Sequence, residues 1–96
     1  MNLFDITGTE SEIEVFEPIA DSGKVLIERI VSRGHASPQD FWYDQERDEW
    51  VALLQGRACL SWEDGRVLDM EAGDWVLIKA HERHRVERTS NDPACI

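Results

Sequence analysis

The feature that most constrains the fold is a series of short apolar runs, most of them closed by a turn signal. The runs cover residues 12–19, 24–31, 49–55, 57–62, 66–70, 74–79 and 84–89, and glycine stands in most of the gaps between them. Strand-length runs at intervals of about 8–12 residues are typical of antiparallel strands. No window of helical length keeps a 3.6-residue period without Gly or Pro. The sequence therefore predicts an all-β domain, either a small antiparallel β-barrel or a two-sheet sandwich.

Two of these runs, residues 50–54 and 75–78, are apolar at consecutive positions. A strand with one wet face alternates between apolar and polar residues, so both faces of these strands are expected to be covered. One face would line the interior. The other is covered either by a second copy of the chain or by the N-terminal strands of the same chain, and we favour a homodimer.

Length and charge limit the partners. The 96 residues are expected to form one domain, 1–96. Because 20 Asp and Glu outnumber 10 Lys and Arg, the net charge is -10, and this field disfavours nucleic acid. No apolar run is long enough to span a bilayer, which predicts that the protein has no membrane partner. The first residues do not resemble a leader, so we expect a cytoplasmic protein. In that compartment Cys59 and Cys95 are expected to be reduced. Residues 94–96 begin a strand that is either very short or clipped.

Two spacings carry a family resemblance. Six residues separate Glu49 from Gly56, and ten separate Gly73 from His84. These intervals match the second half of the first cupin motif and the two ends of the second. The chain thus resembles the cupins over about residues 24–90, with the motifs within about 33–90, and above all small single-domain bacterial cupins of mostly unassigned function. The resemblance implies a jelly-roll-like double-stranded β-helix.

The resemblance also raises the question of a metal. Cupins that bind one typically use three His and one Glu, a set that suits Fe, Mn, Ni or Zn. This chain lacks the two His of the first motif, whose positions fall within residues 42–45. The remaining metal candidates are Glu49 and His84, with Asp44 or Gln45 as a third ligand. The alternative is that Glu49 and His84 form a buried, hydrogen-bonded pair without an ion.

An aromatic cluster at residues 41–43 has two interpretations. It forms either a rim that stacks on a planar or sugar-like ligand, or a plug that closes one end of the barrel. Simple strand alternation places Arg88 on the same face as His84, where it could meet an anionic ligand. The candidate ligand-binding residues are Trp42, Tyr43, Gln45 and Arg88.

Three functions fit this pattern. The first is a small-molecule-binding cupin of unassigned activity, with or without a divalent ion in the barrel. The second is a metal-dependent cupin enzyme of the oxygenase or isomerase type. The third is a metal-free structural or sensor dimer. A fold shared by many chemistries does not decide between them, so the sequence leaves enzyme status open.

Overall fold

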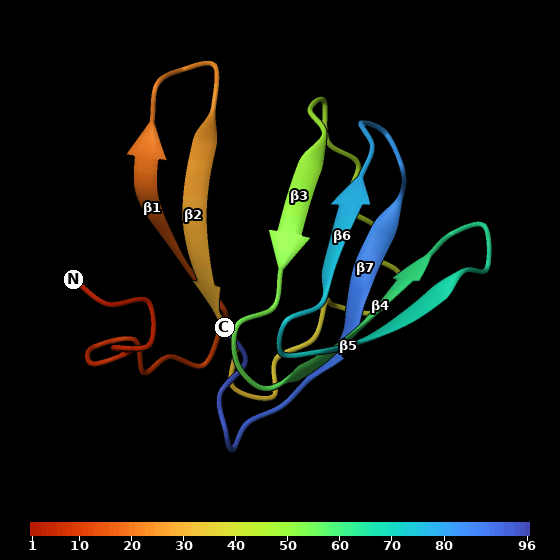
Figure 1. Ribbon diagram of the computed structural model, residues 1–96. Helices are drawn as coiled ribbons and strands as arrows, with labels where there is room; N and C mark the ends of the chain where they lie inside the picture. The colour runs from red at the N-terminus through yellow and green to blue at the C-terminus, as the bar shows by residue number, and fades with distance from the viewer.

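The computed structural model describes residues 1–96 and consists of seven β-strands without a helix (Figure 1). The strands are β1 (Val15–Asp21), β2 (Leu26–Val31), β3 (Glu49–Ala52), β4 (Arg57–Trp62), β5 (Val67–Glu71), β6 (Trp75–Ile78) and β7 (His84–Thr89). They pair antiparallel in three sheets, β1–β2, β3–β6 and β5–β4–β7. The predicted all-β class is therefore confirmed. The structure has no helix long and apolar enough to cross a membrane.

The hydrophobic core is built by side chains from the β5–β4–β7 and β3–β6 sheets and the C-terminal end. In the β4–β5 ladder Leu60 lies opposite Leu68, and Ala58 lies opposite Met70. Because strand residues alternate between faces, these four side chains share the side that faces the interior. Burying each large apolar side chain contributes about 1.5–3 kcal/mol. The buried members of the core cluster are Leu53, Leu60, Trp62, Met70, Ile78 and Cys95.

The β3–β6 sheet has one covered face and one open face. Glu49 pairs with Ile78, and Trp50 pairs with Leu77. Ile78 is only 2% exposed, whereas Trp50 and Trp75 on the other face are each 63% exposed. The suggestion that the N-terminal strands of the same chain cover this outer face is thus wrong. The alternative, cover by a second copy, stays a prediction.

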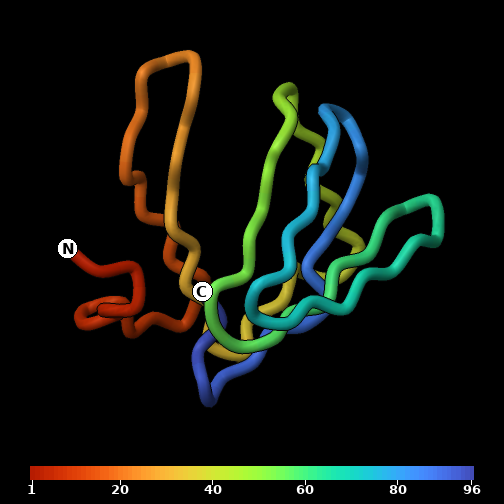
Figure 2. The backbone as a smooth tube through the Cα atoms, in the orientation of Figure 1, coloured from red at the N-terminus to blue at the C-terminus, as the bar shows by residue number.

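The β1–β2 hairpin stands apart from the other strands. Figure 2 shows it rising beside β3, with the N-terminal segment curled at its base. Its strands pair only with each other, and a bulge between Pro18 and Ala20 shifts their register. At the tip, the Arg47 guanidinium donates a hydrogen bond to the Gly23 carbonyl (2.9 Å). The hairpin is thus tethered at its end.

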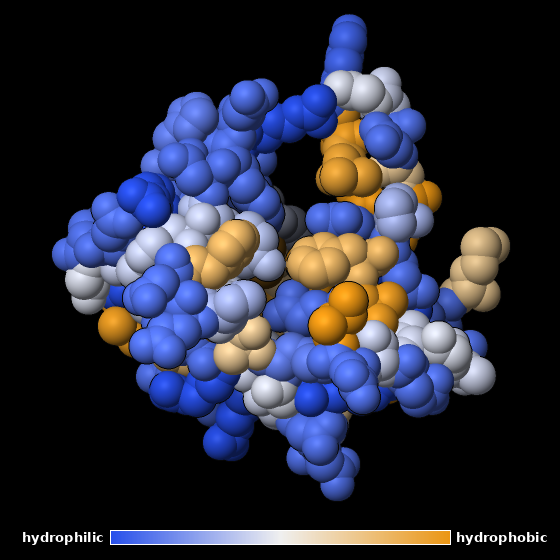
Figure 3. Space-filling view, turned by 180° about the vertical axis from the view of Figure 1, so that it is seen from behind, coloured by the Kyte–Doolittle hydropathy of each residue, from blue (hydrophilic) through white to orange (hydrophobic).

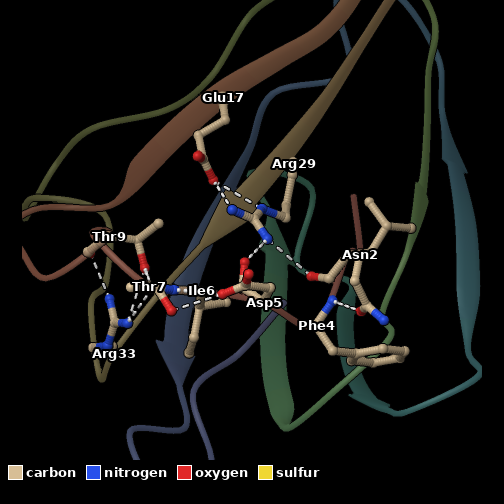
Figure 4. A network of polar contacts seen from close by, with 10 residues as sticks. Asn2, Phe4, Asp5, Ile6, Thr7, Thr9, Glu17, Arg29 and Arg33 are labelled. Carbon is tan, nitrogen blue, oxygen red and sulfur yellow. Dashed lines mark hydrogen bonds and ion pairs between the residues drawn. The ribbon is translucent and has the colours of Figure 1, made fainter.

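Two arginines fix the N-terminal segment to the base of the hairpin (Figure 4). Arg29 of β2 forms an ion pair with Glu17 of β1 and donates hydrogen bonds to the carbonyls of Leu3 (3.0 Å) and Asp5 (2.6 Å). Arg33 binds both the carbonyl and the hydroxyl of Thr9. A guanidinium offers five donors in a rigid fork, so each arginine holds two backbone segments at once.

An irregular segment runs alongside β7. Ser37 donates its N–H to the Val86 carbonyl (2.8 Å) and accepts the Val86 N–H at its hydroxyl (3.0 Å). Further along, Tyr43 and His84 exchange two backbone hydrogen bonds, 2.7 and 3.1 Å long. β7 pairs with β4 on one edge only. These contacts satisfy backbone polar groups on its other edge, and they fix the position of Tyr43.

The C-terminal residues close the bottom of the core. Cys95 pairs with Ser32, and the Ile96 N–H donates to the Gln55 carbonyl (3.0 Å). Gly56 follows directly with a φ of 83°, a left-handed conformation that favours glycine. A Cβ on Gly56 would collide with the Ser90 hydroxyl and lie 2.9 Å from the Ala94 carbonyl oxygen. This position therefore needs glycine for two reasons.

We expect Gly56→Ala to lower the free energy of unfolding more than Gly65→Ala does. Both residues have positive φ, so both variants pay about 1–3 kcal/mol of backbone strain. Only Gly56 also meets close atoms, whereas a Cβ on Gly65 points into open space. The collision should add about 1–3 kcal/mol, measured by urea denaturation of the two variants side by side. Equal losses would show that the C-terminal residues do not pack on Gly56 as described.

Candidate ligand site beside His84

His84 opens strand β7 and points into the core. It is 4% exposed and lies opposite Trp62 of β4. Its Nδ1 is 2.8 Å from the Glu82 carbonyl oxygen. Because a carbonyl can only accept, Nδ1 carries the hydrogen in this contact. In the neutral imidazole, Nε2 is then left as an acceptor, and it makes no hydrogen bond within the chain.

Tyr43 covers one face of the His84 ring. The two rings are stacked, with centroids 5.5 Å apart and planes 25° apart. Phe41 meets the Tyr43 ring edge-on at 4.8 Å and 90°. Aromatic pairs at these separations contribute about 0.5–1.5 kcal/mol beyond the area they bury. Of the predicted aromatic cluster, Phe41 and Tyr43 form an edge-to-face pair, and Tyr43 stacks on His84.

Glu49 brings a carboxylate to the same side of the sheet. Its ladder partner Ile78 belongs to the core, so the Glu49 side chain leaves β3 toward the interior. Burial raises the pKa of the Tyr43 phenol, and the carboxylates of Glu14 and Glu49 raise it further. Tyr43 therefore stacks on His84 and feels the charge of Glu49. No hydrogen bond joins Glu49 to His84, because a strand register fixes the face of each side chain but not which side chain it meets.

Glu14 is a member of this site that the sequence analysis missed. Burial raises the pKa of its half-buried carboxyl, while a hydrogen bond with Ser32 and the charge of His35 act in the opposite direction. Burial, and secondarily the Glu14 charge, also raise the pKa of the Cys95 thiol to about 11. The sequence feature that could have identified Glu14 is its position between Ile13 and Val15, at the start of an apolar run.

The predicted metal donors do not gather around one point. Asp44 is exposed, and its carboxylate oxygen contacts Nδ1 of His81 at 2.7 Å. The chain contains no group of three His, Cys, Asp or Glu side chains placed to hold an ion. Glu49 and His84 remain on the interior side, without a third donor. The side chains therefore do not fit the metal centre that the family resemblance implied.

Gln45 and Trp42, two other predicted ligand residues, lie near Tyr43 in the sequence, and neither is hydrogen-bonded to the His84 ring or stacked on it. Gln45 is half-buried, and its backbone carbonyl accepts the His81 N–H at 2.8 Å. Trp42 is half-buried and precedes Tyr43. No aromatic contact joins Trp42 to the Phe41–Tyr43 ring pair.

Arg88 does not join the site. Leu60 of β4 pairs with Val86, but the next residue, Cys59, pairs with Arg88, so Glu87 forms a β-bulge. A bulge inserts one residue and inverts the alternation beyond it. Arg88 consequently lies on the outer face, exposed and 3.1 Å from Asp69. The prediction that it shares the face of His84 is wrong for this reason.

Two surface hollows are lined by paired charges, and Tyr43 lines neither of them. One, of about 310 Å³, is lined by Trp62, Glu63, Asp64, Arg66, His81 and Arg83. Within it Arg66 binds Asp64 at 2.9 Å, and Arg83 binds Glu63 at 2.9 Å. The second, of about 460 Å³, contains the Arg88–Asp69 pair. Neither offers an uncompensated charge to a ligand.

Comparison with known proteins gives two findings. Residues 29–96 match the family described as "Cupin domain". A crystal structure of a candidate mannose-6-phosphate isomerase from Ralstonia eutropha JMP134 is similar in sequence and shape. It is 40% identical, covers 95% of this chain and 85% of its own, and superposes with a TM-score of 0.88. No curated protein matches the chain.

We expect Glu14→Gln to stabilise the protein at neutral pH and to lose that advantage in acid. Because the folded-state pKa of Glu14 lies above 4.5, its contribution to stability is full below pH 4.5 and is lost as the pH rises through the folded-state pKa. Gln is uncharged, so it does not lose this stability at neutral pH. Urea unfolding at several pH values measures the difference. Glu12→Gln, an exposed neighbour, controls for the loss of one charge, and equal shifts in both variants would contradict the burial of Glu14.

Proposed function

Because the chain belongs to the cupin family, we propose that it binds a small molecule beside Tyr43, Glu49 and His84. One observation carries the proposal. The Tyr43 hydroxyl, the Glu49 carboxylate and His84 Nε2 make no hydrogen bond within the chain, although Tyr43 stacks on the buried His84 ring and the Glu49 side chain leaves β3 toward the interior. Polar groups left open in a partly buried site are available to a ligand.

The chemistry of these groups favours an uncharged polyol such as a sugar. A carboxylate and the imidazole Nε2 accept hydrogen bonds from hydroxyls, and the phenol can donate or accept. The Tyr43 ring offers a flat apolar surface for stacking. The charges that act on Tyr43 are both carboxylates, from Glu14 and Glu49, so a phosphate group would be repelled there.

The name of the Ralstonia relative favours a second candidate, an isomerase acting on a sugar phosphate. Moving a proton between neighbouring carbons requires a base and an acid within hydrogen-bond reach of the substrate. Here Glu49 would serve as the base and Tyr43 as the acid. The acidic surroundings favour the neutral-ligand function over this one.

We expect mannose or another neutral hexose to raise the unfolding temperature more than its 6-phosphate does. Tyr43→Phe removes one hydrogen bond and should weaken binding about 3- to 10-fold, and Glu49→Gln about 10- to 100-fold. Calorimetric titration measures both. Arg88→Ala, on the outer face, is the control and should bind normally. Tighter binding of the phosphate would contradict a neutral ligand, loss of binding in Arg88→Ala would contradict the proposed site, and conversion of the sugar phosphate would support the isomerase.

Metal analysis of protein purified without a metal-affinity step tests the donor geometry. Because Glu49 and His84 lack a third donor, we expect less than one Fe, Mn, Ni or Zn ion per chain. A stoichiometric ion that is lost in both Glu49→Ala and His84→Ala, but kept in His35→Ala, would overturn this expectation and favour a metalloenzyme.

A further inference from the structure

Arg85 is an exception to the way this chain places its charges. Hydrophilic side chains cover most of the face shown in Figure 3, and most of the ion-paired arginines are likewise exposed to water. Arg85 leaves β7 on the side opposite to His84 and Val86, yet its side chain is only 14% exposed. Burying a charge is costly unless the group is paired and hydrogen-bonded, so the contacts of this guanidinium indicate its role.

The Arg85 guanidinium holds two neighbouring carbonyls of the irregular segment that runs beside β7. Nη2 donates a hydrogen bond to the Ser37 carbonyl (3.0 Å), and Nη1 donates to the Pro38 carbonyl (3.3 Å). On the other side, Nε lies 3.1 Å from a carboxylate oxygen of Glu87, and that oxygen also accepts the Ser61 hydroxyl (2.6 Å). The carboxylate thus keeps the cation on the sheet, and the two Nη groups reach from there to the segment.

The contact between Arg85 and Glu87 is an ion pair without a hydrogen bond. Nε is the one buried side-chain nitrogen or oxygen of the chain that has no hydrogen-bond partner, because its N–H does not point at the carboxylate oxygen. A buried donor left without a partner lowers stability. The orientation of the guanidinium therefore satisfies the two carbonyls of the segment and not its own ion pair.

The turn that ends at Phe41 depends on this contact. The Pro38 carbonyl accepts the Phe41 N–H (3.1 Å), and inside the turn Asp40 has a φ of 63°, an uncommon conformation for a residue other than glycine. Residues 38–42 make no backbone hydrogen bond to β7, and the Arg85 guanidinium is the one side chain that hydrogen-bonds to any of them. A strained turn persists only when its surroundings hold it, and this guanidinium provides the polar contact that does so.

Phe41 connects the turn to the proposed ligand site. Its ring meets the Tyr43 ring edge-on at 4.8 Å, and Tyr43 stacks on the buried His84 ring at 5.5 Å. The Tyr43 backbone is fixed by its own hydrogen bonds to His84, but those bonds do not set the direction of the phenol, which can turn between rotamers. The direction of the phenol thus depends on the Phe41 ring, and the place of that ring depends on the turn.

We propose that Arg85 is a positioning residue for the ligand site and acts on it from the opposite side of β7. Its guanidinium holds the turn, the turn places the Phe41 ring, and that ring keeps the Tyr43 phenol stacked on His84. The effect on a ligand rests on the proposed function, whereas the placement of Tyr43 does not. Arginine suits this role because its planar fork reaches two adjacent carbonyls at once, whereas the ammonium of a lysine acts as a point charge.

Fluorine NMR of protein labelled with fluorotyrosine tests the placement, because Tyr43 is the only tyrosine of the chain. The difference in the fluorine shift between ordinary and heavy water reports how far solvent reaches the ring. In Arg85→Met, which keeps an apolar stem, this difference should rise from the value of a half-buried ring toward that of the unfolded protein. In Arg85→Lys it should lie between the two, since lysine can still donate to one carbonyl.

Arg88→Met is the matched control. Arg88 belongs to the same strand and is paired with Asp69, but it does not touch the segment, so the fluorine signal should stay at the wild-type value. Calorimetric titration with mannose then connects the ring to the ligand. Arg85→Met should weaken binding about 2- to 10-fold, because the ligand has to order the ring itself, and Arg88→Met should bind as the wild type does.

Three results would overturn the role of Arg85. They are a wild-type fluorine signal in Arg85→Met whose far-UV circular dichroism is kept, an equal rise in Arg88→Met, and unchanged mannose affinity in Arg85→Met when the wild type binds. Should Arg85→Met not fold, Arg85→Lys decides in its place, because it keeps the positive charge beside Glu87, and a wild-type signal in it would refute the proposal. If mannose binds to no protein, wild type included, the proposed function fails while the fluorine signal still decides on Arg85.

Discussion

The alternation of side chains along the β3–β6 ladder is the constraint on which most of this molecule depends. The same register that turns Glu49 and Ile78 inward turns Trp50 and Leu77 outward. One residue of slip would put a carboxylate on the surface and a tryptophan in the core. The interior position of Glu49 and the exposure of Trp50 on the outer face are therefore two consequences of one pairing, and neither can change without the other.

The polar groups of the interior are held by contacts from different parts of the chain. His84 is fixed by the Glu82 carbonyl below it and by the Tyr43 ring beside it. Tyr43 in turn is placed by backbone hydrogen bonds to β7, not by a strand of its own. The phenol and Nε2 are thus held by neighbouring groups but make no hydrogen bond within the chain. If the proposed ligand binds here, such preorganisation lowers the entropic cost of binding.

The size of the chain explains why it leaves apolar surface uncovered. A domain of this length buries only about two-thirds of the surface of its unfolded chain, and here seven strands are divided among three small sheets. The N-terminal residues contact Arg29 and Arg33 at the base of the hairpin, and Trp50 and Trp75 on the outer face of the β3–β6 sheet stay exposed.

The sequence by itself determined the all-β class and the seven strand positions, because turn signals and strand-length apolar runs are local properties. The cupin motif spacings, rather than periodicity, identified Glu49 and His84 as interior candidates. Tertiary structure decided what those side chains meet. The bulge at Glu87 sent Arg88 to the outer face, and His81 paired with Asp44 away from His84. Glu14 reached the interior from 29 residues before Tyr43. A bulge and a long-range approach depend on contacts between distant segments, and no local pattern in the sequence records them.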